Sequence, residues 1–232
     1  GISPYDPSQM LTLNGDILNT DGSIIFNSIF DENHRVENEC YLLQHFKGWI
    51  IETDEPVFDP GKAVLMDFSV PQTHGTTFAY ILPFSVNTAL VEYTLFTGSL
   101  LDDDAYEAGL TAYLKRYLKG ASYHVREKEF GVIPMTDRRF PAGQGNLFHI
   151  GTAGGQTKAS TGYTFQFIQK QSELIQKALE TGKPLQAISS SPARYRFYDG
   201  ILLELLAKGT PPGKQIFSTL FSRNKAFNIF RF

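Results

Sequence analysis

The 232-residue sequence lacks several features that would each assign it to a class of protein. It has a single cysteine, Cys40, so it can form neither an internal disulfide nor a thiolate metal site, and a reducing compartment fits best. Its five histidines are scattered along the chain, which disfavours a metal site. No apolar run approaches the roughly 20 residues of a membrane span, and no segment has the pattern of a signal peptide.

Motifs of fixed spacing are also scarce. There is no G-x-S-x-G sequence, which disfavours a serine hydrolase, and Lys158 does not follow a glycine at the spacing that a phosphate-binding loop requires. The dinucleotide-binding pattern G-x-G-x-x-G is absent as well.

What the chain does have is a globular composition rich in aromatic residues, with 42% hydrophobic residues, 19 phenylalanines and 11 tyrosines. The net charge of −3 is unevenly spread. The residues from Arg194 onward carry seven basic and two acidic side chains, whereas the residues before Arg194 carry 14 basic and 22 acidic ones. A basic, phenylalanine-rich end on an acidic body suggests contact with nucleic acid or anionic lipid, although a solvated helical face would have the same composition.

Hydrophobic patterning predicts an α+β fold in which a sheet is backed by helices. A turn at Asn19–Gly22 predicts a hairpin of Leu11–Ile17 with Ser23–Ile29, and both faces of Ala63–Val70 are largely apolar, which indicates a sheet covered on both sides. The strands after the hairpin are expected at Tyr41–Glu52, Ala63–Val70, Thr76–Leu82 and Ala89–Phe96. Helices are expected at Asp103–Leu118, at Thr161–Thr181 and from the Ser191-Pro192 cap to Gly209.

Two segments could carry chemistry. In Leu147–Tyr163 a short apolar strand enters a glycine-rich turn before a helix, which is either a cradle for an anion or cofactor or a tight structural turn. Glu92 lies within an apolar, aromatic strand, where its carboxyl is either desolvated, with a raised pKa suited to a general acid, or at an exposed edge. Asp67 presents the same two alternatives.

Several segments, taken in order, resemble the lycopene β-cyclase family of carotenoid-biosynthesis flavoproteins. They are FNSIF (Phe26–Phe30), QHFKGW (Gln44–Trp49), VLMDFSVPQ (Val64–Gln72), FAYILPFS (Phe78–Ser85), LVEYTLF (Leu90–Phe96), GVIPM (Gly131–Met135), IGTAGGQTKASTGYTF (Ile150–Phe165) and RFYDGILLELL (Arg196–Leu206).

This resemblance implies a fold of the FAD-dependent monooxygenase type. It divides the chain into strands of an FAD-binding domain (1–35), a β-sheet substrate domain (36–145), a flavin-contacting strand, loop and helix (146–182) and a C-terminal helical segment (183–232). Because G-x-G-x-x-G is missing, the chain resembles the later part of a longer protein without the N-terminal dinucleotide-binding unit. We therefore expect this chain alone to bind FAD weakly or not at all.

The resemblance also implies an activity, the non-redox cyclisation of the linear ends of lycopene to β-ionone rings, with reduced FAD as cofactor and NAD(P)H as electron source. Glu92 matches the family's acidic motif and is expected to be the catalytic acid or base or the group that stabilises the cation. Asp67 is a second catalytic candidate, on its strand pattern alone. The flavin-contacting residues implied are Gly151, Thr152, Ala153, Gly154, Gly155, Thr161 and Gly162, and no metal is expected.

The implied partners are lycopene or a related linear carotenoid and a membrane surface, without nucleic acid, in a cytoplasmic enzyme peripherally associated with the membrane. The segment Lys214–Phe232 would dock on lipid through Lys214, Arg223, Lys225 and Arg231, which lie among large apolar residues; the same phenylalanines could instead be ordinary core. Two other functions stay open: a different lipid-acting flavoprotein, either a monooxygenase or a reductase, and a non-catalytic carotenoid-binding module.

Overall fold

The computed structural model describes residues 9–11, 16–30, 39–141, 143–185 and 193–229. The chain forms two compact units, which we call the glycine-turn unit (Gly1–Glu39 and Asp137–Gly200) and the large-sheet unit (Cys40–Thr136 and Ile201–Phe232). Each unit combines a sheet with helices, so the predicted α+β class is confirmed. The four segments expected from the sequence divide the chain differently, and the functions attached to them stay predictions.

The large-sheet unit is built on five antiparallel strands. Their order across the sheet is β5 (Val64–Asp67), β6 (Thr76–Pro83), β7 (Thr88–Thr97), β4 (Tyr41–Thr53) and β8 (Tyr123–Thr136). The strands expected at 41–52, 76–82 and 89–96 are confirmed to within one residue at each end. The strand expected at 63–70 is only four residues long, because the chain turns directly after Asp67.

Strand β8 was not predicted from the sequence. Its first half, including the run from Arg126 to Glu129, is exposed and charged, so it shows no apolar alternation. It lies at the edge of the sheet, where charged side chains are common because they discourage pairing with another chain. Only the partner strand β4, which is largely buried, provides the hydrogen-bonding template that makes this segment a strand.

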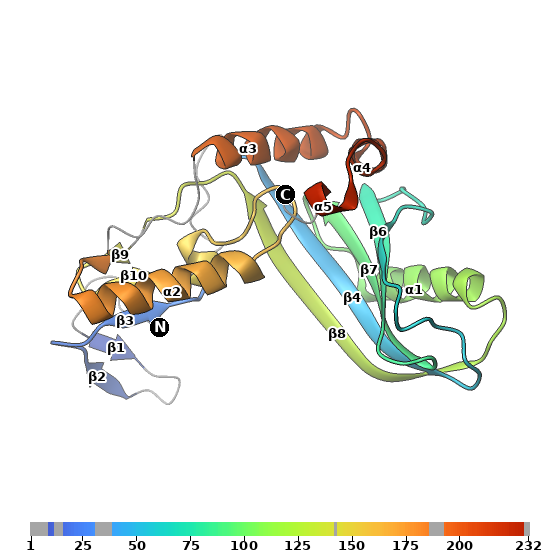
Figure 1. Cartoon of the computed structure of the whole chain (residues 1–232), viewed down its shortest axis with the longest axis horizontal. Coiled ribbons are helices and arrows are strands. Elements are labelled where there is room, and N and C mark those ends of the chain that lie inside the picture. The colour runs from blue at the N-terminus through green and yellow to red at the C-terminus, as the bar shows by residue number, and fades with distance from the viewer. Residues whose placement is uncertain (1–8, 12–15, 31–38, 142, 186–192, 230–232) are drawn as a thin grey trace. The chain divides into compact units, whose positions relative to one another are not determined.

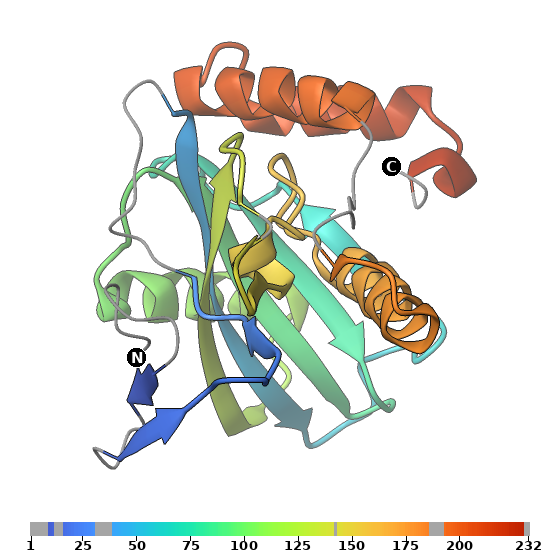
Figure 2. The ribbon, with the colours of Figure 1, turned by 90° about the vertical axis from the view of Figure 1, so that its left-hand side faces the viewer.

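One face of the sheet packs against helix α1 (Asp103–Tyr117), and we call it the α1 face. Figure 1 shows α1 running across the strands, and in Figure 2 the helix lies behind them. The odd-numbered residues of β7 point to this side, where Tyr93 lies against Gly109 so closely that a Cβ at Gly109 would come within 2.7 Å of the ring. The core between sheet and helix includes Trp49, Ile51, Ala79, Ile81, Val91, Leu95, Tyr106, Leu110 and Leu114.

The other side of the sheet, which we call the opposite face, is covered at one end by helix α4 (Gly213–Arg223). Phe217 of α4 is 1% exposed and stacks on Phe68, with ring centroids 5.8 Å apart, and it meets Phe96 of β7 edge-on. The end covered by α4 therefore has helices on both faces. A short helix, α5 (Ala226–Ile229), follows.

In the glycine-turn unit, β1 (Gln9–Leu11) pairs with β2 (Ile17–Asn19), whereas β3 (Ile25–Asn27) pairs in parallel with β10 (Leu147–His149), whose other neighbour is β9 (Gly143–Gln144). The predicted hairpin across residues 19–22 is therefore wrong. The turn itself forms, since the Ser23 N–H donates to the Thr20 carbonyl at 3.0 Å. A turn motif fixes only the change of direction, while a strand from far along the chain supplies the partner of β3.

Two helices and a 3₁₀ helix complete this unit: η1 (Gly151–Gly154), α2 (Phe165–Thr181) and the first half of α3 (Ala193–Lys208), whose second half belongs to the large-sheet unit. Helix α2 begins four residues later than predicted, because residues 161–164 belong to a loop folded back on Lys158. The predicted end of α3 is confirmed by Gly209, whose N–H donates to the carbonyls of Leu205 and Leu206. The Ser191-Pro192 cap lies outside the described residues.

Candidate functional site

Glu92 lies in the middle of β7, in the interior of the sheet. It is directly opposite Tyr80 of β6 on one side and Gly48 of β4 on the other. Its neighbours Val91 and Tyr93 point into the core on the α1 face. Because successive side chains of a strand alternate between faces, Glu92 points to the opposite face.

The surroundings of Glu92 favour its protonated form. Burial raises the pKa of Glu92 to about 7, and the nearby charge of Glu129 adds to this, although a hydrogen bond from Thr94 works against it. The Thr94 hydroxyl donates to Oε1 of Glu92 at 2.8 Å. A carboxyl with a pKa near 7 holds a proton and can also release it at neutral pH, which is what general acid catalysis requires.

Aromatic side chains accompany Glu92 on the opposite face. Phe78 makes edge-on contacts with Tyr80 and Phe96, at centroid distances of 5.3 and 5.1 Å. Phe46 of β4 lies over Gly131 of β8, where a Cβ would come within 2.4 Å of the ring. Phe78 and Phe96 are buried, with Phe96 packed against Phe217 of α4, whereas Tyr80 and Phe46 are half-buried. The half-buried rings and the desolvated acid beside them are suited to an apolar substrate.

Asp67, the second predicted catalytic residue, lies on the α1 face. Its Oδ2 accepts a hydrogen bond from the hydroxyl of Tyr113 in α1 at 2.9 Å, and its Oδ1 accepts one from the Ser69 N–H at 2.8 Å. Burial tends to raise the pKa of Asp67, but these hydrogen bonds and the charge of Arg116 outweigh it, so the pKa lies below its ordinary value. The structure therefore does not bring Asp67 and Glu92 together, and the catalytic role of Asp67 stays a prediction that this geometry does not favour.

The predicted cofactor-binding turn lies between β10 and α2. Gly151 and Gly155 have positive φ angles of 58° and 71°, a conformation that glycine adopts without strain. At Gly154 a Cβ would lie 2.4 Å from the His149 carbonyl oxygen. The close approach at Gly154 serves the chain's own packing, whereas a Cβ at Gly151 would meet only the Ile168 side chain, at 3.7 Å.

The first two N–H groups of η1 differ in whether a hydrogen-bond acceptor lies beside them. The Gly151 N–H donates to Oε1 of the buried Gln171 at 3.0 Å, so this side chain from α2 braces the turn. For the next residue, Thr152, the described part of the chain shows no acceptor for the N–H. Ala153, also predicted to contact the cofactor, is buried within the same turn.

A loop closed by buried polar contacts follows the turn. The N–H groups of Thr161 and Gly162, both predicted contacts, donate to the Lys158 carbonyl at 3.3 and 2.8 Å. The Lys158 ammonium is buried and pairs with Asp199 of α3, which also accepts a hydrogen bond from Ser160 at 2.7 Å. Sequence reasoning missed Asp199 as the partner, because the two residues are 41 positions apart and no local pattern joins them.

A family model described as lycopene cyclase protein matches residues 9–232, which is nearly the whole chain. The chain belongs to the lycopene cyclase family.

Two curated relatives show how much of a family member this chain represents. It is 30% identical to the lycopene beta-cyclase of Paracoccus sp. over 138 residues, which are 57% of this chain and 35% of that protein. It is 29% identical to the chloroplastic neoxanthin synthase of Solanum tuberosum over 189 residues, which are 76% of this chain and 37% of that protein. The chain thus spans little more than a third of the length of these relatives.

Among solved structures, the lycopene cyclase family chain is similar to a geranylgeranyl bacteriochlorophyll reductase-like protein from Thermoplasma acidophilum. The TM-score is 0.48 at 12% sequence identity, and the match covers 84% of this chain and 49% of that one.

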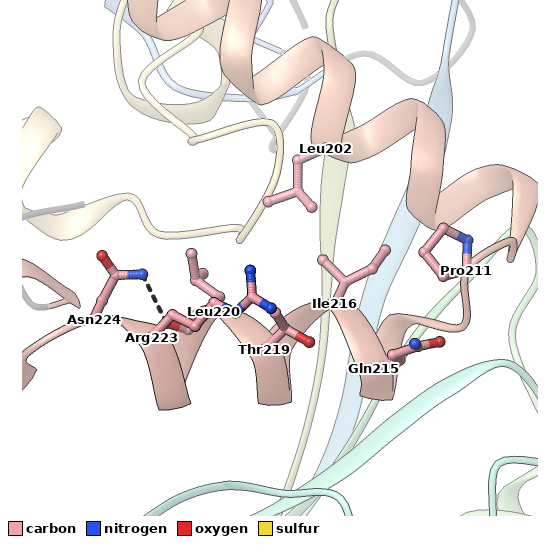
Figure 3. Close-up of a pocket in the computed structure, with 8 residues that line it drawn as sticks. All are labelled: Leu202, Pro211, Gln215, Ile216, Thr219, Leu220, Arg223 and Asn224. Carbon is pink, nitrogen blue, oxygen red and sulfur yellow. Dashed lines mark hydrogen bonds between the residues drawn. The ribbon is translucent and has the colours of Figure 1, made fainter.

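A pocket lies between α4 and the second half of α3. Its volume is about 410 Å³, with Leu202 of α3 facing Ile216 and Leu220 of α4 (Figure 3). The remaining lining residues are Pro211, Gln215, Thr219, Arg223 and Asn224. The pocket is thus apolar inside and carries a cation at its α4 side.

The part of the chain that the structure describes contains neither a cluster of metal-binding side chains nor a helix that could span a membrane. Within it, no group of three or more histidine, cysteine, aspartate or glutamate side chains could hold a metal ion. No helix in the same residues combines the length and the apolar character needed to cross a bilayer.

Proposed function

We propose that the protein to which this chain belongs cyclises the linear ends of lycopene to β-ionone rings. The substrate's terminal double bond takes a proton from an acid and becomes a carbocation. An internal double bond attacks the cation and forms the ring, and loss of a neighbouring proton restores a neutral product. One proton enters and one leaves, so substrate and product are isomers and no electrons are transferred.

Glu92 carries this proposal. It is an acid with a pKa of about 7 on an aromatic sheet face, and protonation of an unactivated double bond needs an acid that stays protonated in apolar surroundings. Because Thr94 donates to Oε1, the proton to be transferred lies on Oε2. After the transfer, the carboxylate lies beside the cation and stabilises it electrostatically.

The proposal includes reduced FAD, with NAD(P)H as the source of its electrons. The turn fits such a group, because the Thr152 N–H at the start of η1 has no acceptor in the described residues, and because a Cβ at the buried Gly151 would meet only the flexible end of the Ile168 side chain, at 3.7 Å. Gly151–Gly155 would lie against the flavin, with Thr161 and Gly162 in the loop beside it. When bound, reduced FAD supplies an electron-rich ring that favours a neighbouring cation.

A test of the reaction is to express the full-length protein in a host that accumulates lycopene, and to analyse the pigments by chromatography and mass spectrometry. We expect a product of the same mass as lycopene with cyclised ends, and its loss in Glu92→Gln. A pigment of changed mass would indicate a monooxygenase or reductase, and bound but unchanged lycopene a binding module. Either result would overturn the proposal.

We further propose that α4 and the adjoining half of α3 contact a membrane of anionic lipid, from which a water-insoluble carotenoid must be taken. In the predicted docking segment, Lys214–Phe232, some of the described side chains are buried in the core and others are exposed. Phe217 belongs to the core, as the competing explanation expected, whereas Phe227 is 68% exposed, and Lys214, Arg223 and Lys225 are exposed cations. The sequence has no acidic residue after Glu204, and the fourth cation, Arg231, lies outside the described residues.

Vesicle co-sedimentation tests this contact. The full-length protein should bind vesicles containing phosphatidylserine, bind less in high salt, and ignore pure phosphatidylcholine. Changing Lys214, Arg223 and Lys225 to glutamate should abolish binding, while the same change at Lys115, Lys119 and Lys170, three exposed lysines elsewhere, serves as control. Equal sedimentation of the first triple variant and the wild type would place the membrane contact elsewhere.

A further inference from the structure

A glycine in β4 separates two glutamates on the opposite face of the large sheet. Gly48 is directly opposite Glu92 of β7 and directly opposite Glu129 of β8. Residues paired directly across strands have their side chains on the same face, so both carboxylates emerge on the side that carries the aromatic rings. Glycine weakens the interior of a strand and often marks a place where another group comes close.

At Gly48 that group is the side chain of Glu129. A Cβ at Gly48 would lie 2.6 Å from Oε1 and 2.8 Å from Cγ of Glu129. The Glu129 side chain therefore lies across the space above Gly48, in the direction of Glu92, and any larger residue at position 48 would displace it. Across three neighbouring strands the order is therefore Glu92, Gly48 and Glu129, and the Glu129 side chain occupies the space that the missing side chain of Gly48 leaves.

We propose that Glu129 is a positioning residue that keeps the proton on Glu92 until the substrate takes it. This proposal rests on the proposed function of Glu92. The two carboxyl groups emerge on the same face on either side of Gly48, and negative charges there repel each other, which favours a proton on one of them. Glu129 lies at the sheet edge and is exposed, whereas Glu92 is the more buried of the two, so the proton is favoured on Glu92.

The other groups around Glu92 do not offset this repulsion. Thr94 of its own strand and Tyr80 of β6 are neutral. The lysines of β4 and β8 belong to the α1 face, where Lys47 pairs with Asp103 and Glu107 of α1, and Lys128 pairs with Glu107 and lies over the Trp49 ring.

At the far end of the same strands, Arg126 is paired with Glu52 at 2.6 Å, and Glu127 adds only a further negative charge. In the described residues no cation therefore lies between Glu92 and Glu129. The charge of Glu129 is accordingly among the causes that raise the pKa of Glu92.

The test is a direct titration of the Glu92 carboxyl by NMR in the full-length protein with ¹³C-labelled glutamate, the signal being assigned by its absence in Glu92→Gln. In Glu129→Gln the pKa of Glu92 should fall by about one unit. Glu127→Gln is the matched control, since it removes the same charge from the same strand, and it should leave the pKa of Glu92 unchanged. An unchanged pKa in Glu129→Gln, or an equal fall in both variants, would overturn the proposal.

The pH profile of cyclisation separates this proposal from the proposed function. In Glu129→Gln the pH at which activity declines should fall by the same amount as the pKa of Glu92, and Glu129→Asp should restore most of the wild-type profile. If the carboxyl titration shifts but Glu92→Gln still forms rings, the coupling between the two glutamates stands and the catalytic role of Glu92 fails. If Glu92→Gln is inactive but Glu129→Gln titrates like wild type, the proposed function stands and the role of Glu129 fails.

Discussion

On the α1 face of the large sheet, Lys47 and Asp67 have complementary partners, whereas on the opposite face the partly buried Glu92 has a second acid for a neighbour. Lys47 donates to Asp103 and Glu107, and Asp67 accepts from Tyr113. Among the described residues, the groups recorded beside Glu92 are the Thr94 hydroxyl, which donates to it, and the charge of Glu129. The same strands supply both faces, so this difference arises from what packs against each face and not from the strands.

The comparison teaches which side of the sheet stabilises the fold and which side is available for chemistry. A buried charge costs free energy unless it is paired, so pairing on the α1 face offsets the cost of burying Lys47 and Asp67 there. The unpaired Glu92 costs stability, and a cost of this kind is typical of functional sites. Variants that affect one face and not the other test this division.

The largest expected effect is a contrast between the two predicted carboxylates. Glu92→Gln should reduce the rate of ring formation by roughly 10²–10⁴-fold, because the acid is lost while the side chain keeps its size. Asp67→Asn should leave activity within about twofold and cost about 1 kcal/mol of stability, because it weakens one hydrogen bond on the α1 face. Pigment analysis and urea unfolding measure the two effects, and comparable loss of activity in both variants would contradict the assignment of faces.

A pH dependence of stability is expected from His45 on the α1 face. Burial lowers the pKa of His45 from 6.5 to about 4. The unfolded chain therefore binds the proton more readily, so the stability contributed by neutral His45 is complete above pH 6.5 and is lost as the pH falls toward 4. This loss amounts to roughly 2–3 kcal/mol.

Urea unfolding between pH 7 and 4.5 measures this effect. His45→Gln should lack this part of the pH dependence, and the exposed His124→Gln should retain it. Identical pH dependence in His45→Gln and the wild type would show that His45 does not cause it.

Tyr106→Phe should destabilise the protein by about 2 kcal/mol. The Tyr106 hydroxyl accepts a hydrogen bond from the Leu101 N–H and bonds to Nδ1 of His45, whose Nε2 is bonded to Thr97. Removing the hydroxyl leaves a buried nitrogen and an N–H group without partners. Chemical denaturation measures the loss, and Tyr163→Phe, at an exposed tyrosine, should change stability by less than about 0.5 kcal/mol.

A gain in stability is expected on the opposite face. Because the folded-state pKa of Glu92 is raised to about 7, wild-type stability declines as the pH rises from about 4.5 to 7. At pH 8 Glu92→Gln should therefore be more stable than the wild type by roughly 2–3 kcal/mol, while at pH 4.5 the two should be nearly equal. A variant that is less stable than wild type at pH 8 would indicate that the carboxylate has a stabilising partner.

Much of the fold could be predicted because its signals are local. The strands at residues 76–82 and 89–96 are rich in apolar residues and bounded by turn residues, and the helix from Asp103 shows its apolar face at helical spacing. The strand β8 and the partner of β3 could not be predicted, because each depends on a strand that is distant in sequence.

The candidate site was predictable in one part only. An acid among apolar strand residues identified Glu92, but the same pattern also selected Asp67, since a sequence shows alternation and does not show which face a helix covers. Glu129 lies in a run of charges that resembles any solvated edge. Its relation to Glu92 depends on the register of three strands and on the missing side chain of Gly48.

The sequence by itself determined the α+β class, the positions of most strands and helices, and the family resemblance, because hydrophobic period, caps and turn residues act over a few positions. Only the tertiary structure decided which carboxyl group is desolvated and which is paired. The reason is electrostatic: the pKa of a carboxyl depends on the water, hydrogen-bond donors and charges within a few ångströms of it, and for Glu92 and Asp67 most of these come from strands and helices far away in the sequence.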